Sequence, residues 1–366
     1  MKCLGGGKLK PVIKWPGGKT REIDKIRHLL PDYERYIEPF FGGGAVFFDL
    51  MPEKGAINDI SNSLMLFYKL IKHQDTNLKE HLVMYDKSFQ SLILSAEQSY
   101  QYILDSYHKE DLHTTKDVVE LVLSNANLSH DLVLDYSKYK KIIFKNVQDK
   151  FNRTHINNEK KKFSHEDLKE NLITGFTSGF YMYFRDIYND INLKKIKVED
   201  SYNIANFYFI REYCYGSMFR YNNKGEFNIP YGGMTYNRKQ FNKKIDAIFN
   251  EEIENLFKDI EIYNLDFEDF LNEVKLTSND FVFLDPPYDT DFSDYEGRSF
   301  DADDQKRLCN YLKNIPSKFI LIIKDTDLIY KLYKDDFNIV SFDKNYTYNV
   351  RSRNERNVTH LIITNY

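Results

Sequence analysis

The sequence has few cysteines and no long apolar stretch. Its 366 residues include three cysteines, Cys3, Cys214 and Cys309, which are odd in number and far apart. This spacing argues against a disulfide framework and a zinc site, and no other residue cluster predicts a metal centre. No apolar run approaches the roughly 18 residues that a membrane-spanning helix needs, and the first residues do not form the apolar segment of a signal peptide. We therefore expect a reduced, cytoplasmic protein with no membrane partner.

An excess of positive charge is also absent. The chain carries 51 Lys and Arg residues against 55 Asp and Glu residues, which gives a net charge of −4. This balance excludes a protein that binds nucleic acid through bulk charge alone, but it permits local basic surfaces. Hydrophobic residues make up 42% of the chain, so it can form a full core. Its length suggests about two to three structural units.

Both ends of the sequence carry the alternating strand and helix pattern of an α/β fold. Strand-like runs are separated by a glycine turn, a helix start and amphipathic segments, which is typical of a parallel sheet. The expected strands are residues 36–38, 55–60, 281–284, 319–323 and 358–363, and the expected helices include residues 21–30 and 303–315. We predict one α/β sheet that both ends of the chain build together.

Helical patterns dominate between residues 85 and 206, so we expect the sheet to be interrupted by an insert of roughly 170 residues. Within it, residues 138–162 hold nine Lys or Arg and only two acids. This stretch fits a solvated helical face. It equally fits a nucleic-acid surface, because aromatic residues are interleaved with the charges. They are Tyr139, Phe144, Phe151 and Phe163.

The strongest chemical signal is Asp285-Pro286-Pro287-Tyr288, directly after the strand-like run 281–284. Ligands of open α/β sheets bind at the carboxyl ends of strands. Asp285 is an acceptor, the two prolines stiffen the turn and expose carbonyl groups, and Tyr288 offers a flat face. Two acceptors beside an aromatic ring suit a planar amine such as that of a nucleobase. The structural alternative is an ordinary turn that ends a strand.

A second signal is Glu38-Pro39-Phe40-Phe41-Gly42-Gly43-Gly44, a strand that runs into glycines and then into a helix. Gly42 and Gly44 allow a ligand to approach the backbone closely. The third glycine of the dinucleotide-binding pattern is missing, which disfavours a pyrophosphate cradle and a dehydrogenase. Asp59 follows 17 residues after Gly42, at the end of the next strand, where an acid can accept hydrogen bonds from both hydroxyls of a ribose.

The third signal is Lys14-Trp15-Pro16-Gly17-Gly18-Lys19, which holds the only tryptophan of the chain. One interpretation is a loop with a tryptophan packed in the core. The functional interpretation is a lid over the charged end of a ligand, with Lys19 near a carboxylate.

Together, and in this order, these motifs and Asn58-Asp59-Ile60 resemble those of the D12 class, or Dam-type, DNA adenine N6-methyltransferases. The resemblance covers about residues 10–72 and 207–366. It implies an S-adenosylmethionine-dependent, Rossmann-like sheet interrupted by a target-recognition domain. It also implies methylation of adenine N6 in double-stranded DNA, with the base flipped out of the helix. A cognate restriction endonuclease is an optional partner.

The resemblance also implies boundaries and residue roles. The methyltransferase domain would comprise residues 1–72 and 246–366, and the recognition region residues 73–245 with a hairpin at 219–233. The catalytic segment would be Asp285, Pro286, Pro287 and Tyr288. Cofactor-binding residues would be Trp15, Lys19, Pro39, Phe40, Gly42, Gly44, Asp59, Asp266, Phe267 and Asp285. DNA-binding residues would be Tyr215, Arg220, Tyr221, Asn222, Lys224 and Asn228.

From the residues alone, Asn223-Lys224-Gly225 predicts a turn between two strand-like arms. Arg220 can contact either a guanine edge or a phosphate, and Tyr215 or Tyr221 can stack in a gap of the helix.

Two other functions stay open. Asp-Pro-Pro-Tyr suits any planar exocyclic amine, so the target can also be cytosine N4 or RNA, and only the resemblance favours adenine in DNA. The second alternative is a DNA-recognition subunit that has lost catalysis. The presence of Gly42, Asp59, Asp285 and Tyr288 argues against this alternative.

Overall fold

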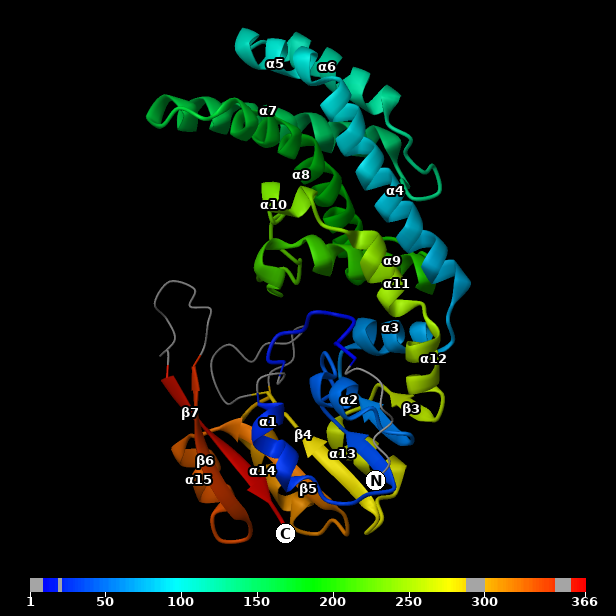
Figure 1. Ribbon diagram of the computed structural model, residues 1–366, viewed down its shortest axis with the longest axis vertical. Coiled ribbons are helices and arrows are strands. Elements are labelled where there is room, and N and C mark those ends of the chain that lie inside the picture. The colour runs from blue at the N-terminus through cyan, green and yellow to red at the C-terminus, as the bar shows by residue number, and fades with distance from the viewer. Residues whose placement is uncertain (1–8, 19–21, 288–299, 346–356) are drawn as a thin grey trace. The chain divides into compact units, whose positions relative to one another are not determined.

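Strands from both ends of the chain lie side by side in one sheet (Figure 1). The computed structural model describes residues 9–18, 22–287, 300–345 and 357–366. Within these residues the sheet has seven strands in the order β3-β2-β1-β4-β5-β7-β6. The strands are β1 (Arg35–Glu38), β2 (Gly55–Asn58), β3 (Ile260–Tyr263), β4 (Asp280–Leu284), β5 (Lys318–Lys324), β6 (Asn338–Asn345) and β7 (Asn357–Thr364).

Strands β1 to β5 pair in parallel, whereas β7 runs antiparallel to both of its neighbours, β5 and β6. The α/β sheet that the sequence predicts is therefore confirmed, including the parallel pairing expected for residues 36–60. The antiparallel direction of β7 was not part of that prediction. A run of apolar residues marks a buried strand without indicating its direction. The sequence did not predict strand β6. Val340 is 56% exposed and Ile339 is half-buried, so this strand lacks the run of buried apolar residues that marks β4 and β5.

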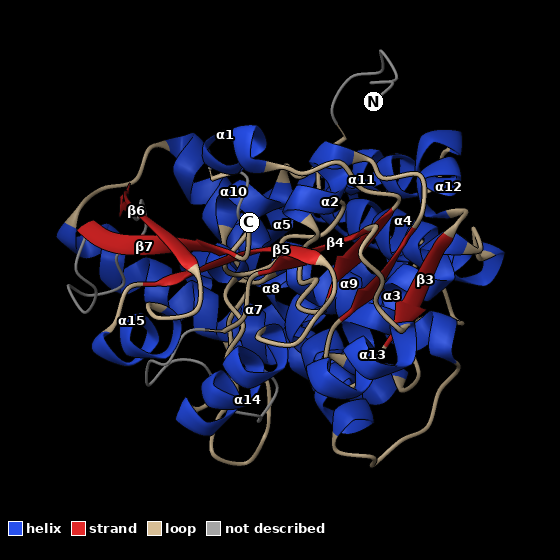
Figure 2. Ribbon diagram, turned by 90° about the horizontal axis from the view of Figure 1, so that it is seen from below, coloured by secondary structure: helices blue, strands red, loops and turns tan. Residues whose placement is uncertain are grey.

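Helices cover both faces of the sheet (Figure 2). Three of them lie on one face, where Leu308 and Phe270 join Val282 and Leu321 in the main core. On the other face, an aromatic cluster forms where Phe47 contacts Tyr36. The helices of the first face are α13 (Phe267–Val274), α14 (Ala302–Leu312) and α15 (Asp327–Tyr333), and the second face carries α1 (Ile23–Ile26) and α2 (Ala45–Leu50). The predicted helix at 21–30 is thus shorter, because Arg27–Leu29 form a 3-10 turn.

The chain divides into two compact units. Residues 1–72 and 251–366 form the sheet unit, and residues 73–250 form the helical unit. Helix α3 (Asn62–Lys72) is the last element of the sheet unit before the helical unit, and α12 (Glu251–Phe257) is the first element after it. The two helices pack against each other. The expected boundary at residue 245 falls within α11 (Phe241–Ile248), which packs on α4 (Thr76–Gln98), so the helical unit extends to residue 250.

Long helices build the helical unit. Helices α7 (Tyr136–Lys160) and α8 (His165–Asn192) pack closely because α8 presents glycines there. A Cβ atom on Gly179 would lie 2.8 Å from the Cα atom of Ile143. None of the described helices combines the length and apolar character that a membrane span requires. Besides α4 and α11, the helices are α5 (Tyr100–Lys109), α6 (Leu112–Asn125), α7 (Tyr136–Lys160), α8 (His165–Asn192), α9 (Asp200–Tyr213), a 3-10 turn (Tyr215–Ser217) and α10 (Met234–Asn237).

The basic stretch 138–162 lies mainly on α7. Tyr139 and Phe151 are buried on the inner face of this helix, so these two residues cannot stack on nucleic-acid bases, and the hypothesis is wrong for them. Phe144 and Phe163 are half-buried. Lys138 forms an ion pair with Asp190 on α8, in which Nζ lies 3.0 Å from Oδ2. The structure therefore favours the interpretation of a solvated helical face with a buried aromatic side.

Candidate active site

A cavity of about 480 Å³ opens in the sheet unit at the carboxyl ends of β1, β2 and β4. Strands β1 and β4 are neighbours from which the chain proceeds in opposite directions across the sheet, and this switch point is where open α/β sheets bind ligands. Eleven of the site residues predicted from the sequence line this cavity. They are Trp15, Pro39, Phe40, Gly42, Gly44, Asp59, Asp266, Phe267, Asp285, Pro286 and Pro287. The other two nominated residues of this unit, Lys19 and Tyr288, lie outside the described residues.

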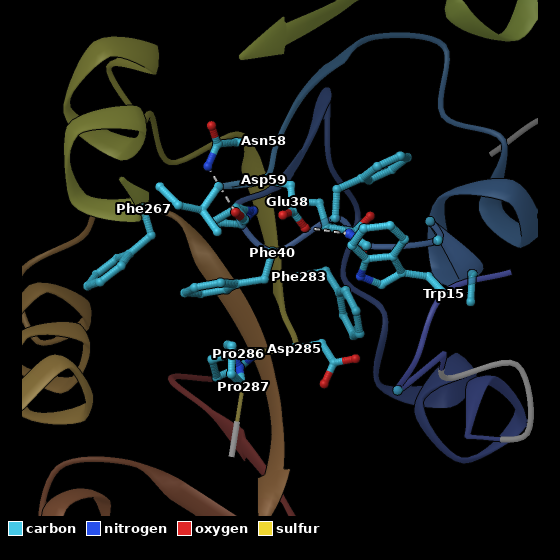
Figure 3. A pocket seen from close by; sticks show the side chains of 18 of the residues that line it. Trp15, Glu38, Phe40, Asn58, Asp59, Phe267, Phe283, Asp285, Pro286 and Pro287 are labelled. Carbon is cyan, nitrogen blue, oxygen red and sulfur yellow. Dashed lines mark hydrogen bonds between the residues drawn. The ribbon is translucent and has the colours of Figure 1, made fainter. Parts of the chain in front are cut away.

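The glycine turn after β1 is shaped to accept Trp15. Gly42 has a φ of +51°, and a Cβ atom there would lie 2.9 Å from Cδ1 of the indole. Gly44, with a φ of +66°, begins α2, and a Cβ atom on it would meet the ring of Phe41 at 2.5 Å. Trp15 is half-buried and forms one wall of the cavity, opposite Phe267 (Figure 3). Its place is thus at the ligand cavity rather than in the core.

Asp59 ties the end of β2 to the glycine turn. Its two carboxylate oxygens accept hydrogen bonds from the backbone N–H groups of Gly42, at 2.8 Å, and Ser61, at 3.0 Å. Burial raises the pKa of Asp59, and these backbone hydrogen bonds offset part of that increase. Because each carboxylate oxygen has a second lone pair, Asp59 can still accept from a ligand hydroxyl.

Asn58 is a cavity residue that the sequence analysis did not single out. Its buried amide donates to the carbonyl oxygens of Pro39 at 3.0 Å and Leu265 at 3.1 Å, and its Oδ1 accepts from the Leu265 N–H at 2.8 Å. Asn58 therefore holds together the segments that follow β1, β2 and β3. The only sequence signal was its place beside Asp59 in the Asn-Asp-Ile motif.

Three aromatic rings line one end of the cavity. The ring centroid of Phe40 lies 5.5 Å from those of both Phe267 and Phe300, and the latter two are 5.7 Å apart. Such spacings are typical of favourable aromatic contacts. The cluster offers a flat, apolar surface to a heteroaromatic ring. Phe300 was missed because it follows Asp285 by 15 residues and belongs to no motif.

A shared arginine orients the acids at this end. Arg307 on α14 lies 2.7 Å from both Asp266 and Asp304 and 2.9 Å from Glu268. Its hydrogen bond with Asp266 is the main reason that its pKa is raised. The Asp266 carboxylate also accepts from the Glu268 N–H at the start of α13. The guanidinium lies 4.9 Å from the ring centroid of Phe267, so it fixes the acids and the ring together.

The Asp-Pro-Pro segment leaves the end of β4 and is held by α14. Asp285 is half-buried at the cavity (Figure 3). The amide of Gln305, which is fully buried, donates to the carbonyl oxygen of Pro287 at 3.0 Å. The other end of this amide, Oε1, has no hydrogen-bond partner among the described residues. Gln305 was not predicted, because nothing in the sequence near it marks a contact with Pro287.

Acidic side chains outnumber basic ones in the cavity lining, and Arg307 pairs with two of the acids, Asp266 and Asp304. Five acids line the cavity, and no described lining residue is Lys or Arg. One of these acids, Glu38, accepts a hydrogen bond from the Tyr36 hydroxyl at 2.8 Å. An excess of carboxylates in a concave site favours a ligand that carries positive charge or several N–H and O–H donors. The five acids are Glu38, Asp59, Asp266, Asp285 and Asp304.

The predicted hairpin belongs to the helical unit. Its expected turn is confirmed: the Gly225 N–H donates to the Asn222 carbonyl at 2.9 Å, and Gly225 has a φ of +74°. The arms pair through isolated bridges, one between Tyr221 and Phe227 and one between Cys214 and Tyr231 at the base, so they do not form regular strands.

Two nominated side chains are occupied in building the hairpin. Asn222 Oδ1 accepts from the N–H groups of Lys224 and Glu226, at 2.9 and 3.0 Å, and the hydroxyl of Tyr221 pairs with that of Tyr188 at 2.9 Å. Asn228 is half-buried. The remaining three nominated residues, Tyr215, Arg220 and Lys224, have exposed side chains.

The sequence is similar to known proteins along most of its length. The chain matches the family model of D12 class N6 adenine-specific DNA methyltransferases over residues 15–174 and 156–348. It is 29% identical over 364 residues to the type II methyltransferase M.CviBI of Paramecium bursaria Chlorella virus NC1A. The aligned region covers 98% of this chain and 100% of the viral protein. The type II methyltransferase M.MjaIII of Methanocaldococcus jannaschii is 27% identical over 350 residues, 90% of each chain. A DNA adenine methylase of Vibrio cholerae is 20% identical over 95% of this chain and 94% of its own. The chain therefore belongs to the D12 class of N6 adenine-specific DNA methyltransferases.

Proposed function

We propose that the cavity of the sheet unit binds S-adenosylmethionine and that the Asp-Pro-Pro segment holds an adenine flipped out of duplex DNA. The observation that carries this proposal is the acidic cavity at the strand switch point, which Asp285 helps to line. The cofactor has a sulfonium and an ammonium group, which suit a lining in which Glu38, Asp59 and Asp285 are acids that do not pair with Arg307. The volume of about 480 Å³ lies within the range of roughly 300–1,000 Å³ that is usual for cofactor sites.

The proposed cofactor contacts follow from the chemistry of the lining. Phe40, Phe267 and Phe300 would pack its adenine ring, and Asp266, fixed by Arg307, would accept from its amino group. Asp59 would accept from the ribose hydroxyls. Trp15, Pro39, Gly42 and Gly44 would enclose the methionine part, and Lys19 would lie near its carboxylate. When bound, the cofactor supplies an electrophilic methyl group on a sulfonium sulfur.

The catalytic role falls on the segment after β4. The amino group of a paired adenine is not accessible to a methyl donor, so the base must leave the stack. The Asp285 carboxylate and the Pro286 carbonyl would accept hydrogen bonds from its two N–H groups. Pro287 would hold the turn, and Tyr288 would stack on the base. This arrangement directs the N6 lone pair at the methyl carbon. Held in this way, N6 would take up the methyl group that the bound cofactor supplies, the sulfur would keep the electron pair of the broken bond, and N6 would then release a proton to the solvent.

Positioning would make the main contribution to the rate. Holding two reactants at contact distance contributes several kcal/mol to lowering the barrier. Asp285 also stabilises the positive charge that develops on N6, because its carboxylate faces the N–H bonds that become more acidic. A neutral amine can attack without a metal ion or a nucleophilic cysteine.

The exposed side chains of the hairpin would make the DNA contacts. Arg220 would contact a guanine edge or a phosphate, Lys224 a phosphate, and Tyr215 would stack in the gap left by the flipped base. Tyr221, Asn222 and Asn228 would hold the hairpin in shape beside the DNA. Two relatives are named type II methyltransferases. A restriction endonuclease of the same site specificity is therefore the proposed partner.

The test is methyl transfer from labelled S-adenosylmethionine to unmethylated duplex DNA, with the product bases identified after digestion. We expect N6-methyladenine, and sequencing of the methylated DNA would then give the recognised site. N4-methylcytosine would contradict the proposal, as would transfer to RNA in a parallel reaction when duplex DNA takes up no label. Cofactor binding without transfer would indicate a recognition subunit that has lost catalysis.

A further inference from the structure

The hairpin that would read the DNA has little backbone structure of its own. One bridge, between Tyr221 and Phe227, joins its arms near the turn, and a second, between Cys214 and Tyr231, joins the chain at its base. Neither arm forms a strand. An isolated two-stranded hairpin is only marginally stable in water. Sequence readout nevertheless requires Arg220 to present its guanidinium in a fixed geometry, because base discrimination rests on directional hydrogen bonds. Some other part of the helical unit must therefore hold the hairpin in place.

Asn189 on α8 takes the place of a neighbouring strand. Its buried amide accepts from the Phe227 N–H at 2.7 Å and donates to the Phe227 carbonyl at 3.1 Å. This is the donor and acceptor pair that an adjacent strand would supply to an edge residue. A single side chain thus fixes the register of the second arm against the helix.

Further polar side chains on α8 extend this contact. The Tyr181 hydroxyl donates to the Ile229 carbonyl at 2.9 Å, and Arg185 Nη1 lies 3.5 Å from the same oxygen. The hydroxyls of Tyr188 and Tyr221 are 2.9 Å apart. Residues four, seven and eight positions apart share one face of a helix. We define these four residues as the α8 stripe: Tyr181, Arg185, Tyr188 and Asn189.

Apolar contacts attach the hairpin independently of the α8 stripe. The ring of Phe219 lies 6.2 Å from that of Phe207 on α9, and the guanidinium of Arg211, on the same helix, lies 3.7 Å from the Phe219 ring centroid. Loss of the stripe's hydrogen bonds should therefore leave the hairpin attached but less firmly oriented, because apolar contacts are not directional.

We propose that the α8 stripe sets the DNA sequence specificity of methylation by fixing the register and orientation of the hairpin. This inference rests on the proposed function, in which the hairpin contacts DNA. A loosened hairpin keeps the attraction of Lys224 for phosphate, which is insensitive to sequence. It loses the difference in contact energy between the correct base and an incorrect one. The residues of the stripe are positioning residues that touch neither the base nor the cofactor.

The experiment compares two kinds of variant with a matched control. Asn189→Leu removes the strand-like contact with little change in volume. The double variant Tyr181→Phe/Tyr188→Phe deletes two hydroxyls and keeps both rings. The control, Tyr183→Phe, deletes a hydroxyl from the same helix, where it accepts from the Asp135 N–H and its ring packs on Tyr139 of α7. Thermal melting establishes that each protein is folded at the assay temperature.

The readout is the ratio of kcat/KM on duplexes with the recognised site to kcat/KM on duplexes with one changed base pair. We expect this ratio to fall about tenfold in Asn189→Leu and in the double tyrosine variant, which is the scale of one base contact. It should not change in Tyr183→Phe. The maximal rate and the affinity for the cofactor should stay within about twofold of wild type in all variants, because the residues of the stripe touch neither the base nor the cofactor. A twofold change is smaller than the effect of a single base contact.

Two results would overturn the inference. An unchanged ratio in folded variants would show that the stripe does not set specificity, and an equal loss on all duplexes would show a general structural role. If Asn189→Leu does not fold, the tyrosine variant decides. Failure of the proposed function looks different: Arg220→Gln and Lys224→Gln would leave DNA affinity and specificity unchanged, or the wild-type protein would methylate no adenine.

Discussion

Asp285 is the residue whose loss should separate chemistry from binding. Asp285→Ala removes the carboxylate that would accept from the adenine amine, while β4 and the cavity keep their other contacts. We expect the rate of methyl transfer in a single turnover to fall at least about a hundredfold, as for other groups that stabilise developing charge. DNA affinity should stay within a few-fold of wild type.

The matched control for Asp285 is Asp303→Ala, which removes an exposed acid of α14 that pairs with Lys306 on the same helix, at 2.8 Å. It should transfer methyl groups like the wild type. DNA affinity and transfer that fall together in Asp285→Ala would mean that Asp285 has a structural role instead.

Gln305 should act on the rate through Pro287. Gln305→Met has a similar length and removes the N–H that holds the Pro287 carbonyl. It also replaces the buried Oε1 that has no partner among the described residues, and burying such an atom costs about 1–3 kcal/mol. We therefore expect a melting temperature equal to or above that of wild type, together with a kcat lowered about tenfold and little change in the KM for the cofactor. An unchanged kcat would contradict this positioning role.

At the scale of elements, β1 and β4 carry most of the site and are joined at their other ends by an ion pair. Arg35 Nε and Nη2 donate to the two oxygens of Asp280, at 2.8 and 2.7 Å. Burial by itself would raise the pKa of Asp280. The hydrogen bonds from Arg35 and from the Thr277 N–H outweigh burial, so the pKa of Asp280 is lowered.

This ion pair predicts a pH-dependent stability. Because the pKa of Asp280 is lower in the folded than in the unfolded state, its contribution is present above about pH 4 and is lost as the pH falls through the folded pKa. Asp280→Asn should lower the free energy of unfolding at pH 7 by about 1–2 kcal/mol, a moderate value because Arg35 is partly exposed. Urea unfolding at several pH values should show this difference shrinking in acid. A difference independent of pH would contradict the ion-pair explanation.

At the scale of the whole molecule, the two compact units should respond differently to the cofactor. A ligand that binds only the folded state at 100 times its Kd adds about 2.7 kcal/mol to stability. We expect the product analogue S-adenosylhomocysteine to slow amide hydrogen exchange in the strands of the sheet unit, residues 1–72 and 251–366. Exchange in the helical unit, residues 73–250, should change little. Equal protection of both units would mean that they unfold together.

Local sequence was sufficient for residues that act through their own neighbours in the chain. The glycine turn, the Asp-Pro-Pro segment and the Asn-Lys-Gly turn could be predicted because a few adjacent residues determine both their backbone and their chemistry. Asn58 and Asn189 could not be predicted in the same way. Their partners, Leu265 and Phe227, lie 207 and 38 residues away in the sequence. No periodicity or motif links residues at such separations.

The sequence by itself determined the α/β class, the split of the sheet by a helical segment and the family, because patterns of burial and short motifs are properties of contiguous residues. Only the tertiary structure decided the antiparallel direction of β7, the buried position of Tyr139, the hold of Gln305 on Pro287 and the contact of α8 with the hairpin. These features depend on which surfaces meet when the chain folds. Packing across the molecule is a property of pairs of distant segments, and a single segment does not specify it.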